Sequence, residues 1–191
     1  TLPADELDSI KSILLQDIKA LADNPARRVM VELGKRYYPA PHGRSSLGTE
    51  EGIGRCDLPQ LQRAWRERFR PRGSILSVAG RLDCSRTRAM VERLFGSWQG
   101  VAPALPKFGQ LPPHVPNHIE FESAQMQIAF AYPSARFGER HYYASKVLAG
   151  ILSGGMFGRL FIEVREKRGL CYSVFARHSA TKEYGTVVAY A

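Results

Sequence analysis

The chain has 191 residues, of which 44% are hydrophobic, so it is long enough to bury a core as one large or two small domains. Its 27 Lys and Arg outnumber 18 Asp and Glu, and the net charge of +9 fits a nucleic-acid binder or a cavity that selects acidic substrates. It has neither an apolar run long enough to cross a membrane nor a secretory signal pattern, so we expect a soluble protein and assign no compartment.

The first hundred residues are dominated by helical patterns, in which apolar side chains recur three and four residues apart. Residues 39–56 are rich in proline and glycine and predict a loop, whereas the apolar run 74–80 predicts a short strand. The expected helices cover residues 4–22, 25–37 and 58–69, and a further helix that Ser85 caps.

Much of the positive charge lies on and just after the predicted helix 58–69. Trp65 and Phe69 fall among these arginines, but at helical spacing with Leu58 and Leu61, which is typical of a buried stripe. A solvated basic face is therefore favoured over a nucleic-acid surface, for which the sequence carries no recognised motif.

Five prolines fall in residues 100–117, and such a stretch is neither a helix nor a central strand. We therefore expect an extended linker there, between the end of one α/β unit at residues 1–99 and the start of a second at 118–191. The fold class is α+β.

The second unit is expected to combine strands with one helix. Because its last predicted strand is cut at Ala191, we expect a longer parent chain. The predicted strands cover residues 119–121, 125–132, 172–178 and 185–191, the last two joined as a hairpin. The predicted helix covers residues 139–152 and carries Tyr142, Tyr143, Val147, Leu148 and Ile151.

Residues 153–174 contain the main candidate site. Gly154 and Gly155 precede an amphipathic helix with Phe157, Leu160, Phe161 and Val164 on one stripe, and Gly169 ends it. A reversal at Gly169 would bring Arg165 and Tyr172 together, where a guanidinium and a phenol could bind a carbonyl or a carboxylate. Alternatively, Arg165 offsets the helix dipole and Tyr172 is half-buried core.

The sequence Arg-Glu-Lys-Arg-Gly-Leu-Cys-Tyr-Ser-Val, after Gly-Gly-Met-x-x-Arg-Leu-Phe, resembles the pitrilysin/insulinase-like zinc peptidases, which include the mitochondrial processing peptidases. The resemblance implies units that are mostly antiparallel sheets with helices on one face. It implies that two such halves, as a homodimer, a heterodimer or one chain, close around an extended peptide that adds a strand to a sheet edge. It also implies that Arg165 and Tyr172 bind substrate and stabilise the transition state. Gly154 and Gly155 would contact substrate, or form a tight strand-to-helix connection.

Zinc in this family is bound by His-x-x-Glu-His and a distal Glu, and this sequence lacks that motif. The three cysteines are unclustered, His42 is a single loop histidine, and the closest histidine pair, His114 and His118, lies in the predicted linker. By the resemblance, the position of the distal ligand falls near Asp8, with Glu6 two residues earlier, and both are weak metal candidates. Zinc is therefore expected in the family or a partner, and the chain alone is expected to be inactive.

Three functions remain open from the sequence. The favoured one is the non-catalytic half of a zinc endopeptidase that lends the Arg/Tyr pair. The others are a structural or assembly subunit of the same fold, like the respiratory-complex core proteins, and a basic nucleic-acid-binding module whose binding would be salt-sensitive.

Overall fold

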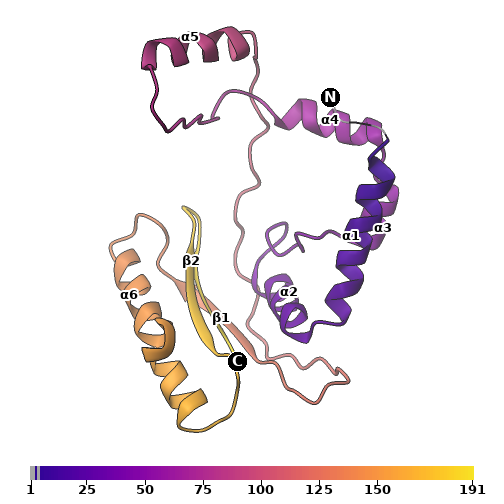
Figure 1. Ribbon diagram of the computed structural model, residues 1–191. Helices are drawn as coiled ribbons and strands as arrows, with labels where there is room; N and C mark the ends of the chain where they lie inside the picture. Colours follow the sequence, from indigo (N-terminus) through magenta and orange to yellow (C-terminus); the bar gives the residue numbers. More distant parts are fainter. Residues whose placement is uncertain (1–2, 4) are drawn as a thin grey trace. The chain divides into compact units, whose positions relative to one another are not determined.

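The computed structural model describes residue 3 and residues 5–191, which divide into two compact units (Figure 1). The first comprises the described residues up to Ile13 together with Glu51–Pro106, and the second comprises Leu14–Glu50 and Lys107–Ala191. Helix α1, Leu7–Ala22, contributes residues to both. Helices combine with a small antiparallel sheet, which confirms the α+β class.

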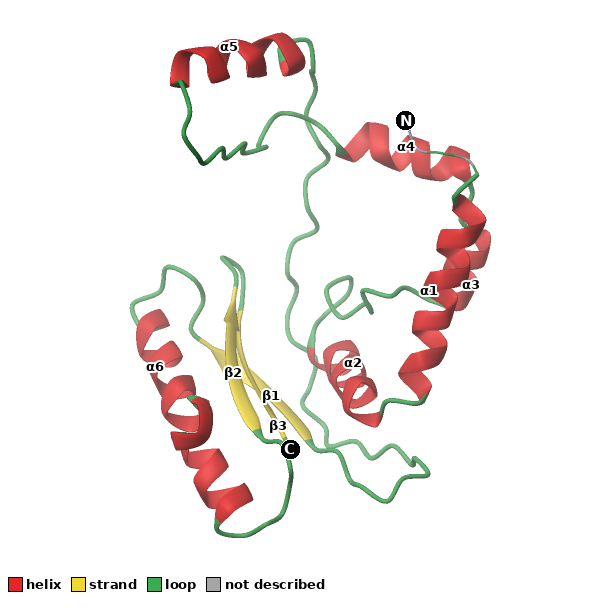
Figure 2. Ribbon diagram, in the orientation of Figure 1, coloured by secondary structure: helices red, strands yellow, loops and turns green. Residues whose placement is uncertain are grey.

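The first unit is helical, with α3 at Glu50–Arg55, α4 at Leu58–Arg68 and α5 at Cys84–Phe95 (Figure 2). The side chain of Asp57 accepts a hydrogen bond from the Gln60 backbone N–H at 2.8 Å, so α4 begins where its cap predicts. For α5 the predicted cap was wrong. Asp83 accepts from the Arg86 N–H at 2.8 Å, and the Ser85 hydroxyl donates to the same carboxylate.

Two predictions for this unit were wrong. Residues 74–80 form no strand, because no neighbouring segment among the described residues offers a ladder of backbone hydrogen bonds. The predicted loop 39–56 contains the short helix α3. Two of its six residues are glycines, which lower its helix propensity, so the sequence pattern did not predict a helix there.

The second unit contains a three-stranded antiparallel sheet in the order β1-β3-β2 (Figure 2). The hairpin of β2, Phe175–Ala180, and β3, Gly185–Tyr190, is confirmed, with Ala180 opposite Gly185. Strand β1, Ala129–Ser134, begins later than predicted, and residues 119–121 form no strand. Because β1 lies at the sheet edge, Pro133 within it is tolerated.

Two helices pack against this sheet. Helix α2, Pro25–Tyr37, contacts β1, and α6, Tyr142–Ser153, contacts β2. The side chain of Asn24 accepts from the Arg27 N–H at 2.9 Å, which fixes the start of α2 as predicted. The core is small, and the buried side chains among the described residues are those of Tyr37, Ala149, Ala176, Thr186 and Val187.

Four large side chains of α6 lie outside the core. Tyr143, Val147, Leu148 and Ile151 are all exposed. The helix instead faces Phe175–His178 of β2 with Lys146, Ala149, Gly150 and Ser153, at helical spacing. Small side chains let a helix approach a strand closely, so the larger apolar stripe stays outside.

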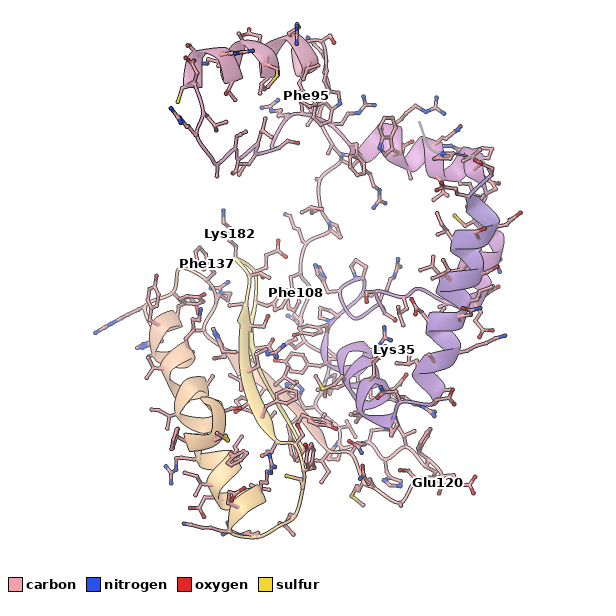
Figure 3. The ribbon with its side chains drawn as sticks, viewed as in Figure 1. Lys35, Phe95, Phe108, Glu120, Phe137 and Lys182 are labelled. Atoms are coloured by element: carbon pink, nitrogen blue, oxygen red, sulfur yellow. The ribbon has the colours of Figure 1, made fainter. Side chains whose placement is uncertain are left out.

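Residues 102–117 contain no helix or strand, as their prolines predict. Part of this segment is held in the second unit by aromatic contacts around Phe108, which lies near the β2–β3 turn (Figure 3). The Phe108 ring stacks on Tyr184 with centres 4.5 Å apart, and its N–H donates to Glu183 Oε2 at 3.1 Å. Tyr38 and His42 also contact the Phe108 ring.

Candidate functional site

The segment that follows α6 changes its backbone geometry twice. After Gly154 it forms a short 3₁₀ helix, η1, at Gly155–Phe157, and then a π-helix, η2, at Phe161–Glu166. In η2 the Lys167 N–H donates to the Ile162 carbonyl at 2.9 Å, a five-residue step. The predicted helix is thus present from Leu160 on, but Phe157 is 89% exposed and lies outside the apolar stripe. Local π-helical turns occur often at functional sites.

The chain reverses at Gly169. Its φ of 60° lies in the left-handed region, which glycine adopts without steric cost. The Gly169 N–H donates to the Arg165 carbonyl at 2.9 Å, and the Leu170 N–H donates to the Val164 carbonyl at 3.1 Å. These two hydrogen bonds close the end of η2 and turn the chain back along it.

The reversal places Tyr172 beside Arg165, as the sequence predicts. The Arg165 Cζ lies 4.8 Å from the centre of the Tyr172 ring and 4.7 Å from the centre of the Phe161 ring. Both distances are within the range of cation–π attraction. The guanidinium is therefore held by two aromatic rings, one before it and one after it in the chain.

Both polar groups of this pair are accessible. Tyr172 is 84% exposed, so the alternative that it belongs to the half-buried core is wrong. The Arg165 side chain is 36% exposed, and its Nε lies 3.9 Å from Glu166 Oε1, too far for a hydrogen bond. The guanidinium and the phenol can thus donate hydrogen bonds to a group that arrives from solvent.

The two cations that follow the pair's arginine in the chain, Lys167 and Arg168, are engaged with Glu163. Glu163 is paired with Lys167 at 2.7 Å and with Arg168 at 3.1 Å, and the hydrogen bonds from these side chains lower the pKa of Glu163. The carboxylate is therefore ionised at neutral pH and engaged with these two cations rather than with Arg165. Arg165 remains available to a carbonyl or carboxylate from outside.

Gly154 and Gly155 connect α6 to η1, so the connection joins two helices and not a strand to a helix. Gly155 has a φ of 79°, and a side chain there would be strained. Both glycines are exposed. The backbone conformation of the turn thus explains why residue 155 is a glycine. The exposed backbone of the turn is also accessible to a ligand.

The two candidate metal ligands, Glu6 and Asp8, belong to no cluster of metal-binding side chains in the described part of the chain. Glu6 and Asp8 are exposed at the start of α1. Within residue 3 and residues 5–191, no three His, Cys, Asp or Glu side chains group closely enough to bind a metal ion. The described residues therefore do not fit a zinc site, and we assign no catalytic step to zinc bound by this chain. His42 and His114 pack on aromatic rings, His114 with its centre 5.6 Å from that of Tyr37.

The second unit also contains a groove of about 1070 Å³, which no sequence pattern predicted. It is lined by α2, by residues 113–128 and by Ala129–Ala131 of the edge strand β1. The α2 side of the groove includes Val29, Leu33 and Tyr37. A groove beside an edge strand is the kind of surface to which an extended peptide adds. None of the helices that the structure describes is long and apolar enough to span a membrane.

Comparison with known proteins identifies the family of this chain. The family model described as the peptidase M16 inactive domain matches residues 55–191. The chain is 31% identical, over its whole length, to the uncharacterized zinc protease YmxG of Bacillus subtilis. It is 28% identical over 98% of its length to an uncharacterized zinc protease of Mycobacterium tuberculosis. It covers 46% and 44% of these proteins, so it spans about half the length of the curated relatives it matches.

Solved structures show the same fold. The crystal structure of a peptidase M16 inactive domain from Pseudomonas fluorescens matches the whole chain with a TM-score of 0.86 and 31% identity, and the chain covers 47% of it. A protease from Helicobacter pylori matches the whole chain with a TM-score of 0.82 at 16% identity, and the chain covers 48% of it. The resemblance to zinc peptidases that the sequence indicated is thus confirmed, and the chain belongs to the family of peptidase M16 inactive domains.

Proposed function

We propose that this chain is part of the non-catalytic half of a zinc-dependent endopeptidase that cleaves extended peptides. Its contribution is to bind the peptide through Arg165 and Tyr172. The observation that carries the proposal is the position of the Arg165 guanidinium, which lies 4.8 Å from the centre of an exposed tyrosine ring. The zinc proteases among its relatives support the reaction class.

The chemistry of the pair suits a peptide carbonyl. The guanidinium and the phenol are both hydrogen-bond donors, and the guanidinium keeps its charge at any physiological pH. Donors of this kind stabilise the negative charge that develops on a carbonyl oxygen during hydrolysis. The net charge of the chain, +9, would also attract acidic residues of a substrate.

The sheet edge supports an extended substrate. Among the residues that the structure describes, β3 is the only strand paired with β1, and Ala129–Ala131 line the groove. Backbone hydrogen bonds to such an edge bind peptides with little regard to their sequence. We propose that the exposed backbone of Gly154 and Gly155 also touches the bound peptide. The zinc-binding half would come from the same parent chain or from a second subunit, as a homodimer or a heterodimer.

Peptide cleavage tests this proposal, using the full-length protein alone and mixed with its partner half. We expect Arg165→Ala and Tyr172→Phe each to lower kcat/KM by roughly ten- to a hundredfold without changing the melting temperature. Matched controls are Arg177→Ala, an arginine that also lies over an aromatic ring at 5.7 Å, and Tyr143→Phe, an exposed tyrosine on α6.

Unchanged cleavage in both Arg165→Ala and Tyr172→Phe would exclude these roles. If neither the full-length protein nor the mixture cleaves any peptide, the structural or assembly subunit becomes the better assignment. Tight, salt-sensitive binding of nucleic acid would instead favour the basic binding module.

A further inference from the structure

The Phe161 ring is the half-buried side of the aromatic pair that holds Arg165. Phe161 lies four residues before Arg165, where side chains on neighbouring helical turns meet. The Arg165 Cζ is 4.7 Å from the centre of its ring. Phe161 is half-buried, whereas Tyr172 on the other side is 84% exposed. The two rings therefore differ in how firmly the surrounding structure fixes them.

No carboxylate in the described part of the chain holds Arg165 firmly. The nearest ion pair recorded for it is to Glu166 at 3.9 Å, and Glu166 is exposed. Such a contact restricts an arginine little, because it is screened by water and lacks hydrogen-bond geometry. Glu163, the other nearby acidic residue, forms ion pairs with Lys167 and Arg168. The direction of the guanidinium is therefore set by the rings.

We infer that Phe161 is a positioning residue, whose ring fixes the Arg165 guanidinium so that it points at the substrate when Tyr172 turns towards the peptide. This inference rests on the proposed function, because it assumes that Arg165 binds the peptide. Tyr172 is 84% exposed, so its ring is held less firmly by its surroundings than the half-buried ring of Phe161. The Phe161 ring already faces the cation before a peptide arrives.

The test compares Phe161→Leu with Phe161→Tyr in the full-length protein and its partner half. Leucine keeps an apolar group of similar size but removes the aromatic face, while tyrosine keeps that face. We expect Phe161→Leu to lower kcat/KM about three- to fivefold, and Phe161→Tyr to retain wild-type activity. Phe137→Leu, at a half-exposed phenylalanine packed on Tyr142, is the matched control.

A double-mutant cycle separates positioning from general support of the fold. In the Arg165→Ala background, Phe161→Leu is expected to cause no further loss, because the group that it positions is gone. Losses that multiply, or a Phe161→Tyr variant as poor as Phe161→Leu, would overturn the inference. A harmless Arg165→Ala variant would overturn the proposed function instead.

A second measurement tests the positioning itself without any cleavage. The NMR order parameter of the Arg165 Nε–H reports how tightly the guanidinium is held. We expect it to fall in Phe161→Leu and to stay at its wild-type value in Phe161→Tyr and Phe137→Leu. An order parameter that is the same in Phe161→Leu and wild type would overturn the inference whatever the activity shows.

Discussion

The Arg165 guanidinium carbon lies 4.8 Å from the centre of the Tyr172 ring, although a left-handed glycine separates the two residues along the chain. The contact depends on the reversal at Gly169, whose N–H is bonded to the carbonyl of Arg165 itself. The arginine is therefore tied to the turn through its backbone and to the tyrosine through its side chain. A change at the glycine should disturb both.

Substituting Gly169 is expected to cost stability and activity together. In Gly169→Ala a side chain must adopt a φ of 60°, which costs about 1–2 kcal/mol. We also expect lower peptide cleavage, since a shifted turn moves Tyr172 away from Arg165. The control is Gly150→Ala in α6, where an added Cβ meets no atom within 4 Å and helix propensity improves. Urea denaturation and cleavage rates check both effects, and equal stability of the two variants would contradict the first.

The ion pairs of Glu32 predict a pH-dependent effect. Hydrogen bonds from Lys35 and then Arg36 lower the pKa of Glu32 below 4.5. A carboxyl whose pKa is lower in the folded state stabilises the fold above the unfolded pKa, and this contribution is lost as the pH falls through the folded pKa. We expect Glu32→Gln to lose about 0.5–1 kcal/mol at pH 7.

The difference between wild type and Glu32→Gln should shrink as the pH falls below 4.5. Urea denaturation across this pH range measures it, with Glu122→Gln, an exposed glutamate, as the control. A difference that is constant with pH would show that the charge of Glu32 is not its source.

The ring of Phe108 is expected to fasten residues 107–115 to the β2–β3 turn. Removing it in Phe108→Ala deletes the stack on Tyr184 and the contacts with Tyr38 and His42, and should cost about 2 kcal/mol. Limited proteolysis should then cut residues 102–117 faster. Met126→Ala, at a residue that is 75% exposed, is the control, and equal protease sensitivity of both variants would argue against this role.

We predict that substituting the two metal candidates, Glu6 and Asp8, leaves zinc binding unchanged. Because Glu6 and Asp8 are exposed and belong to no group of three ligands in the described residues, Glu6→Gln and Asp8→Asn should leave the zinc content of the full-length assembly as it is. Metal analysis after chelation and reloading measures this, with Asp17→Asn further along α1 as the control. Zinc loss confined to either variant would identify that carboxylate as a ligand.

Elements with their own end signals could be predicted from the sequence. Asn24 and Pro25 fix the start of α2, and the β2–β3 hairpin follows from two short runs around a tight turn. The meeting of Arg165 with Tyr172 is of the same kind, because it needs only a helix end and the glycine that follows.

Features that depend on a partner could not be predicted. The apolar run at Ile75 has the composition of a strand, but pairing requires a second segment. Helix α6 carries the apolar residue Val147, but this side chain is exposed. The small residues Ala149 and Gly150 face the neighbouring strand instead. The π-helical step at Lys167 and the groove beside β1 arise from packing, for which no local pattern exists.

The apolar run at residues 75–78, which joins no strand ladder among the described residues, has a consequence for handling the chain by itself. Ile75 is 92% exposed, and Leu76 and Val78 are exposed beside it. An extended apolar segment with unpaired backbone groups is a template for pairing between molecules, and so a route to aggregation. We expect concentration-dependent association of the isolated chain, which light scattering would detect and a single lysine at position 75, Ile75→Lys, would suppress.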